Sequence, residues 1–189
     1  MNANLTNFPD SRPIIDGYTV TEQLYSGSGT AVYRAIQETR QRSVVIKVLQ
    51  RDYPSFGELV QFRNQYLMTK RLTIPGIAKP FALEPFGNGY ALVMEDTGSL
   101  SLSQYLENQS LSLLDILEIA IQVTIILQQL HQQRIIHKDI KPANILIAPN
   151  SKQITLIDFS IASFHGFAVF SSLLRSSAIS FKTCSGVVR

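Results

Sequence analysis

The sequence predicts an α+β fold of two lobes, in which a five-stranded antiparallel small lobe precedes a helical lobe and a cleft separates the two. Short segments rich in Val, Ile, Tyr and Thr dominate residues 18–95. Apolar residues at helical spacing dominate from residue 98 onward. With 189 residues, of which 45% are hydrophobic, the chain can bury a sizeable core, which excludes a disordered chain or a collagen-like repeat.

The first three strands are predicted at Tyr18–Tyr25, Ala31–Ile36 and Ser43–Leu49. Gly27-Ser-Gly29 separates the first two, and the polar stretch 37–42 separates the second from the third. Connections this short join antiparallel neighbours. The three segments therefore predict an antiparallel meander.

A helix and two more strands complete the predicted small lobe. Ser55 can cap the start of a helix that runs to about Leu72, and Glu58, three residues on, can reach back in a capping box. The helix ends before a Pro-Gly pair. Two strand-like segments, Ile77–Leu83 and Tyr90–Glu95, then flank a Gly-Asn-Gly turn.

The clearest helix of the second lobe carries five apolar residues at spacings of 4, 3, 4 and 3. These residues are Ile116, Ala120, Val123, Leu127 and Leu130. Their spacing predicts one buried stripe. Two brief strands, Ile145–Ile147 and Ile154–Ile157, follow and bracket a tight turn at Pro149-Asn150.

Charge and cysteine content narrow the class of protein. The formal net charge of +3 comes from basic residues after Asp158, since the chain up to that point has 14 acidic and 14 basic residues. The charge therefore predicts no nucleic-acid partner. The single Cys184 excludes an internal disulfide and fits a reducing compartment. Without a signal-peptide pattern or a long uninterrupted apolar segment, we expect a cytoplasmic chain with no membrane insertion.

Two polar motifs carry the chemistry of the second lobe. They are His137-Lys-Asp139-Ile-Lys141-Pro-Ala-Asn144 and Leu156-Ile-Asp158-Phe159-Ser160. Both resemble protein-kinase motifs, the first the catalytic loop and the second the metal-binding Asp-Phe-Gly. The alternative, a chance cluster of polar turn residues, is disfavoured because so many positions match.

The resemblance assigns a role to each residue of these motifs. It implies that Asp139 is the catalytic base, that Lys141 contacts the transferred phosphate, and that Asn144 and Asp158 are the Mg²⁺ ligands. Oxygen ligands of this kind suit that cation. Two departures affect regulation and backbone freedom, because Lys138 replaces the loop arginine and Ser160 replaces the motif's glycine.

A lysine in the third strand provides a second, independent match. Val45 and Lys47 are two residues apart, so their side chains point to one face of the strand, where one can cover an adenine and the other can reach phosphates. A buried ammonium needs a partner, whereas the alternative is an edge-strand charge in water. The family's spacing puts Gln65 at the position of the usual glutamate. Gln65 can hydrogen-bond Lys47 but cannot neutralise it.

The glycine-rich loop of the family is only partly present. With Val32 taken as its valine, the three glycine positions hold Tyr25, Gly27 and Thr30. The other register would put Arg34 at the valine position, which must pack on a base, and it is rejected. Backbone N–H groups around Gly27 can still cradle a phosphate, although an ordinary hairpin turn remains the alternative.

The segment after the fifth strand resembles the adenine-binding hinge of the same family. The resemblance implies that main-chain groups of Glu95 and Thr97 bind adenine, with Met94 behind the base and Leu146 below it. A short edge strand followed by a turn is the alternative interpretation of this segment.

From Tyr18 to about Ala162 the chain is similar to Ser/Thr protein kinase domains, particularly those at the start of large bacterial multidomain signalling proteins. The resemblance implies a protein-kinase-like fold, ATP and Mg²⁺ as cofactors, and transfer of the γ-phosphate to Ser or Thr hydroxyls of a protein substrate. Two other functions stay open. One is a non-catalytic ATP-binding or interaction module, favoured by Gln65, by Ser160 and by the incomplete large lobe. The other is a small-molecule kinase of the aminoglycoside or choline type.

The resemblance also predicts the domain limits. We expect a flexible leader at 1–13, the small lobe at 14–97 and a partial, incomplete helical large lobe at 98–163. Residues 159–189 contain no Pro, Asp or Glu but eight Ser and five Phe, so 164–189 is interpreted as a tail unrelated to the kinase. A divergent activation segment is the alternative. On this interpretation the chain is truncated, downstream signalling domains are lost from it, and apolar surface on the 116–130 helix is uncovered.

Overall fold

A computed structural model describes residues 13–165, so nearly all of the predicted 1–13 leader and of the predicted 164–189 tail lies outside the described residues. The chain divides into two compact units. The first joins the residues up to Lys70 with Ala78–Gly98, and the second joins Arg71–Ile77 with the residues from Ser99 onward. Each unit is described by itself below.

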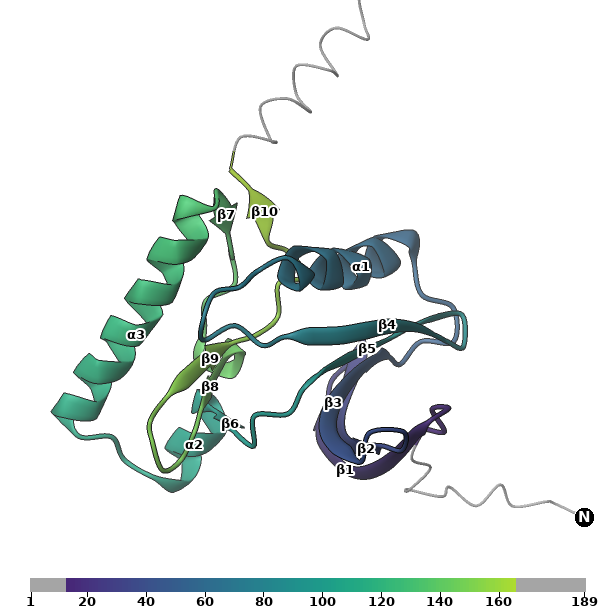
Figure 1. Cartoon of the computed structure of the whole chain (residues 1–189), viewed down its shortest axis with the longest axis horizontal. Coiled ribbons are helices and arrows are strands. Elements are labelled where there is room, and N and C mark those ends of the chain that lie inside the picture. Colours follow the sequence, from purple (N-terminus) through teal and green to yellow (C-terminus); the bar gives the residue numbers. More distant parts are fainter. Residues whose placement is uncertain (1–12, 166–189) are drawn as a thin grey trace, which may run out of the picture. The chain divides into compact units, whose positions relative to one another are not determined.

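The first unit is a five-stranded antiparallel sheet with one helix (Figure 1). Its elements are β1 (Tyr18–Ser26), β2 (Thr30–Gln37), β3 (Arg42–Leu49), α1 (Phe56–Lys70), β4 (Pro80–Phe86) and β5 (Gly89–Glu95). The strands lie in the order β1-β2-β3-β5-β4. This arrangement confirms the predicted meander, the predicted helix and the five-stranded antiparallel sheet.

Small and branched apolar side chains fill the core on one face of this sheet. Buried members of this cluster are Ala31, Ala35, Val44, Ile46, Val48, Ala91 and Val93. On the other face, Phe62 of α1 packs against Leu49 and Leu92. Helix α1 therefore covers part of the face on which β3 carries Lys47, because Lys47 and Leu49 are two residues apart.

The fourth strand lies three residues later than the sequence predicts. We expected Ile77–Leu83, whereas β4 spans Pro80–Phe86. Its two prolines are accommodated because Pro80 opens the strand and β4 is at the edge of the sheet, where a missing N–H breaks no ladder. Ile77 instead makes an isolated parallel bridge with Leu156 in the second unit.

The second unit contains helices and short strands. Its elements are β6 (Leu100–Ser101), α2 (Leu102–Asn108), α3 (Leu113–Gln132), β7 (Ile135–Ile136), the 3-10 helix η1 (Pro142–Asn144), β8 (Ile145–Ile147), β9 (Ile154–Leu156) and β10 (Ser163–Phe164). Strands β6, β8 and β9 form one sheet in that order, and β7 pairs with β10. The predicted hairpin across Pro149-Asn150 is confirmed by the antiparallel pairing of β8 and β9.

The predicted buried stripe of α3 is wrong for most of its members. The buried residues of α3 are Ile119, Ile126 and Leu130, so Leu130 alone was placed correctly. Ile116 is 49% exposed, and Ala120 is exposed too. Apolar residues cover much more of the helix than the face that packs, so spacing alone could not identify that face.

Helix α3 leaves many apolar side chains in contact with solvent, as predicted. Those exposed are Leu113, Leu114, Ile116, Leu117, Ile121 and Ile125. Within the described residues, α3 is the helix whose length and composition alone would allow it to cross a membrane. It is nevertheless attached to the β8–β9 hairpin, since Gln122 donates to the carbonyl of Lys152 at 3.0 Å and accepts from the N–H of Ile154 at 3.1 Å.

Candidate functional site

Helix α1 begins with the predicted capping box. The backbone N–H and the hydroxyl of Ser55 donate to Glu58 Oε2 at 2.8 and 2.7 Å, and the N–H of Glu58 donates to Ser55 Oγ at 3.3 Å. The hydrogen bonds from Ser55 lower the pKa of Glu58. The cap fixes where the helix starts, and so which α1 residue faces β3 two turns later.

Strand register brings four of the predicted nucleotide-binding residues to one face of the sheet. Val32 is the cross-strand partner of Lys47, and Val45 is the partner of Met94. Cross-strand partners project to the same face, as do residues two apart such as Val45 and Lys47. Val32, Val45 and Met94 are half-buried, whereas Lys47 is only 9% exposed. The first unit therefore presents an apolar patch next to a buried ammonium.

Gln65 of α1 is the hydrogen-bond partner that the sequence predicts for Lys47. Lys47 Nζ donates to Gln65 Oε1 at 3.1 Å, and Gln65 is 3% exposed. The other end of the same amide donates to the sulfur of Met94 at 3.9 Å. The two ends of the Gln65 amide thus contact Lys47 of β3 and Met94 of β5, which fixes the orientation of the amide.

The β1–β2 turn is narrow, and its glycine lies against an aromatic side chain. The N–H of Gly27 donates to the carbonyl of Thr30 at 2.9 Å. A Cβ at Gly27 would overlap the ring of Tyr25, which occupies the first glycine position of the family's loop. The Tyr25 side chain therefore lies over the turn.

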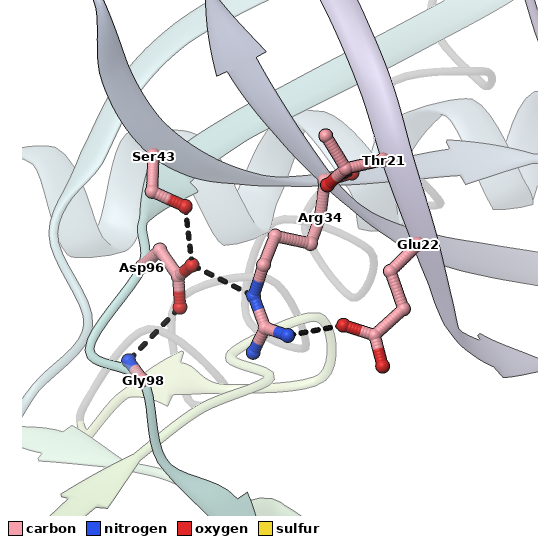
Figure 2. A network of polar contacts seen from close by, with 6 residues as sticks. All are labelled: Thr21, Glu22, Arg34, Ser43, Asp96 and Gly98. Carbon is pink, nitrogen blue, oxygen red and sulfur yellow. Dashed lines mark hydrogen bonds and ion pairs between the residues drawn. The ribbon is translucent and has the colours of Figure 1, made fainter.

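The hinge segment after β5 is held to the sheet by its own carboxylate, which the sequence analysis did not single out (Figure 2). Asp96 Oδ2 accepts from Arg34 Nε at 2.9 Å and from Ser43 Oγ at 2.6 Å. Its Oδ1 accepts from the N–H of Gly98 at 2.9 Å. Glu95 and Thr97, on either side, are exposed. The Asp-x-Gly spacing was the available sequence signal, since it is typical of an Asx turn.

In the second unit, residues of the predicted catalytic loop meet at one carboxylate. Asp139 Oδ2 accepts from Asn144 Nδ2 at 2.8 Å and lies 2.8 Å from Lys141 Nζ. Asn144 Nδ2 also donates to the carbonyl of Asp139 at 2.9 Å. Pro142 begins the 3-10 turn that brings Asn144 back toward Asp139. Asp139 is 30% exposed and Lys141 51% exposed, so both reach solvent while Asn144 is buried.

Asp158 is placed beside this loop through its neighbour Ile157. The N–H of Ile157 donates to the carbonyl of Asn144 at 3.0 Å, and the carbonyl of Ile157 lies 3.0 Å from His137 Nε2. The N–H of Asp139 donates to His137 Nδ1 at 3.3 Å, which makes Nε2 the protonated nitrogen of a neutral ring. Burial lowers the pKa of His137, in agreement with that tautomer.

Two residues of the predicted motifs have a strained backbone. Lys138 has φ +69° and Asp158 has φ +65°, both in the left-handed region that non-glycine residues avoid. The Phe159 ring, buried, lies edge-on to His137 with centroids 4.5 Å apart and helps to hold this conformation. Strain of this kind is typical of functional segments.

The donor set of the second unit fits a cation that is shared with phosphates. Because Nδ2 of Asn144 donates to Asp139, its Oδ1 is left as the acceptor atom, and Asp158 adds a carboxylate. Within residues 13–165 no group of three or more His, Cys, Asp or Glu side chains is placed to hold a metal ion alone. Magnesium commonly binds through one or two protein groups, phosphate oxygens and water, so the residues present fit Mg²⁺.

The structure therefore gathers the predicted site residues into two groups, one in each unit. The first unit holds Gly27, Val32, Val45, Lys47, Met94, Glu95 and Thr97. The second holds Asp139, Lys141, Asn144, Leu146 and Asp158. Leu146 is in β8, half-buried, and pairs with Ser101 and Thr155.

Comparison with known proteins gives a family match over most of the chain. The family model of the protein kinase domain matches residues 18–172. The chain is 32% identical over 148 residues to the serine/threonine-protein kinase PrkC of Bacillus subtilis, covering 77% of this chain and 23% of that protein. It is also 32% identical over 152 residues to the serine/threonine-protein kinase PknA of Mycobacterium tuberculosis, covering 77% of this chain and 35% of that protein. A protein kinase and PP2C-like domain-containing protein of Arabidopsis thaliana is 28% identical over 149 residues.

Proposed function

This chain belongs to the protein kinase domain family, and from that membership and the geometry above we propose that it transfers the γ-phosphate of ATP to Ser or Thr hydroxyls of proteins. Its aligned part corresponds to 23% of PrkC and 35% of PknA. The proposal therefore concerns the nucleotide-binding and catalytic portion of a kinase. The printed names of both relatives, serine/threonine-protein kinases, favour protein hydroxyls as acceptors.

The observation that carries the proposal is the convergence of Lys141 and Asn144 on the carboxylate of Asp139. In the proposed reaction the acceptor oxygen bonds to the γ-phosphorus, the bond from that phosphorus to the bridging oxygen breaks, and ADP leaves. The hydroxyl proton passes to Asp139. Lys141 is close enough to Asp139 to contact the transferred phosphate, and the Asn144 hydrogen bond aims the carboxylate.

The remaining residues bind the nucleotide. Lys47 supplies a positive charge to the phosphates, while Val32, Val45 and Met94 offer an apolar surface to the adenine. Main-chain groups of the hinge would read the edge of the base. Asn144 Oδ1 and the Asp158 carboxylate would hold Mg²⁺, which neutralises phosphate charge when it is bound.

A second candidate function rests on Gln65. The amide at 3.1 Å from Lys47 is neutral, whereas kinases use a glutamate here. With Gln65 in place of that glutamate, Lys47 can still bind phosphates, so the alternative is a module that binds Mg²⁺ and ATP without transferring phosphate.

One experiment on the whole chain separates these two functions. Thermal unfolding is measured with and without Mg²⁺ and ATP, and transfer of radiolabelled γ-phosphate is measured on the chain itself and on a generic Ser/Thr-rich protein. Ligand at 100 times its dissociation constant would stabilise the chain by about 2.7 kcal/mol. Stabilisation with transfer supports the kinase, and stabilisation without transfer supports the binding module.

Lys47→Met is the matched control because methionine keeps the length of the buried stem and removes the charge. It is expected to abolish the nucleotide-dependent stabilisation. If the chain gains no stability from Mg²⁺ and ATP, both functions are wrong. If Lys47→Met gains as much as the parent, the role given to Lys47 in binding the phosphates is wrong.

A further inference from the structure

Among the acidic groups in the described part of the first unit, the carboxylate of Asp96 makes the most hydrogen bonds to other strands (Figure 2). Its side chain is only 8% exposed. It accepts from Arg34 in β2, from Ser43 in β3 and from the N–H of Gly98 in its own segment. We call Arg34, Ser43 and Asp96 the hinge anchor.

The hinge anchor joins parts of the chain that are far apart in sequence. Asp96 is 62 residues from Arg34 and 53 from Ser43. Backbone pairing between β3 and β5 ends at the pair Val44 and Glu95. Beyond that pair, Asp96 continues the attachment to the sheet through its side chain.

A local turn completes the attachment. The bond from the Gly98 N–H to Asp96 Oδ1 closes an Asx turn around Thr97, and Gly98 takes the left-handed φ of +64° that a glycine tolerates. The same carboxylate thus fixes the segment on both sides, to the sheet through Oδ2 and to its own backbone through Oδ1. Segments with these restraints lose less entropy when they order around a ligand.

From this geometry we propose that the hinge anchor is a positioning device for adenine recognition, holding the main-chain groups of Glu95 and Thr97 in their base-binding arrangement before the nucleotide arrives. The inference rests on the proposed function, because it requires that this segment binds the base. Arg34 and Asp96 act through the backbone and contact no substrate atom themselves.

The electrostatics of the anchor agree with a permanent ion pair. Burial raises the pKa of Asp96, but the hydrogen bonds from Ser43, Gly98 and Arg34 outweigh burial and the net shift is downward. Arg34 also pairs with Glu22, whose side chain is 55% exposed. Glu22 therefore offers a matched control, since removing its charge changes the same guanidinium without changing the hinge contact.

The test compares dissociation constants of Mg·ATP and Mg·GTP, measured by calorimetry on the full chain, for the parent, Arg34→Met, Asp96→Asn and Glu22→Gln. Methionine keeps the stem of Arg34, and asparagine keeps an oxygen for Gly98. Adenine and guanine present opposite donor and acceptor patterns on the edge that the hinge would read. A general loss of fold weakens both nucleotides equally, whereas a displaced hinge lowers the preference for ATP.

The proposal predicts that Arg34→Met and Asp96→Asn each weaken ATP about tenfold, from the loss of one charge-assisted hydrogen bond, and that the ATP preference over GTP falls by a similar factor. Glu22→Gln should stay within about twofold of the parent. Arg34→Lys should recover part of the loss. Ser43→Ala is a smaller change at an exposed position, and it should give a smaller loss of the ATP preference that can be measured if Arg34→Met does not fold.

An unchanged ATP preference in the folded anchor variants would overturn the proposal while leaving nucleotide binding intact. So would an equal loss in Glu22→Gln. If the parent itself binds no Mg·ATP, the proposed function fails and the anchor's role fails with it. The two failures are therefore distinguishable by the parent measurement alone.

Discussion

Replacing Gln65 by glutamate tests how the buried lysine is used. The change exchanges the amide nitrogen for an oxygen and adds a negative charge at a position that is 3% exposed, with Lys47 Nζ 3.1 Å from the retained oxygen. It also removes the weak N–H contact to the sulfur of Met94 at 3.9 Å. Little volume changes, so the effect on packing should be small.

Two opposed terms decide the magnitude. At 3.1 Å the attraction between unit charges is about 5 kcal/mol for an effective dielectric constant of about 20. Removing the new carboxylate from water costs several kcal/mol, which cancels most of that attraction. Replacing the neutral acceptor of the Lys47 hydrogen bond by a charged one leaves a gain of about 1 kcal/mol. We expect this to fix Lys47 more firmly and to raise nucleotide affinity and phosphoryl transfer about fivefold.

The assay measures the Mg·ATP dissociation constant and the rate of γ-phosphate transfer for the parent, Gln65→Glu and Gln61→Glu. Gln61 is on the same helix but exposed, so its substitution adds the same charge to α1 without reaching Lys47. Gln61→Glu should match the parent. The reasoning is refuted if Gln65→Glu changes neither quantity, or if Gln61→Glu changes them equally.

Two further predictions concern stability. Burial lowers the pKa of His137 below its usual 6.5, so the neutral ring stabilises the native state above about pH 6.5, and this stabilisation is lost as the pH falls through the lower native pKa. Urea unfolding should therefore give a lower stability at pH 5.5 than at pH 7.5. His137→Gln keeps a donor for Ile157 and should lose less stability over the same pH range. Gly76→Ala should destabilise the second unit by about 3 kcal/mol or more, because φ is +81° and a Cβ would meet Ile126 Cδ1 at 2.5 Å. Gly87→Ala, with φ +54° but nothing within 4 Å, should cost only about 1 kcal/mol in the same denaturant titration, and equal losses would contradict the steric argument.

Sequence patterns predicted the structure correctly where it depends on residues that are close together in the sequence. The capping box at Ser55 and Glu58 involves residues three apart, and the β8–β9 hairpin is set by its turn. The hydrogen bond between Lys47 and Gln65 was also predictable, because strand alternation and family spacing fix both positions. These features need no knowledge of distant packing.

Other features depend on tertiary contacts that the sequence pattern does not encode. The edge position of β4 makes Pro85 acceptable, but edge strands cannot be identified before the strand order is known. Helix α3 is apolar over most of its circumference, so its packed face is set by the neighbours of Ile119 and Ile126. Arg34 and Asp96 form the anchor across 62 residues and resemble ordinary surface charges in the sequence.

The central claim is that Asp139 takes the hydroxyl proton in phosphoryl transfer from ATP. Asp139→Asn keeps an oxygen that can accept from Lys141 and Asn144, so the loop geometry and the affinity for Mg·ATP should be preserved. The direct measurement is the single-turnover rate of γ-phosphate transfer at saturating Mg·ATP, for the parent and for Asp139→Asn. The account predicts transfer by the parent and a rate at least about 100-fold lower in the variant. Equal rates, or no transfer by the parent, would contradict it.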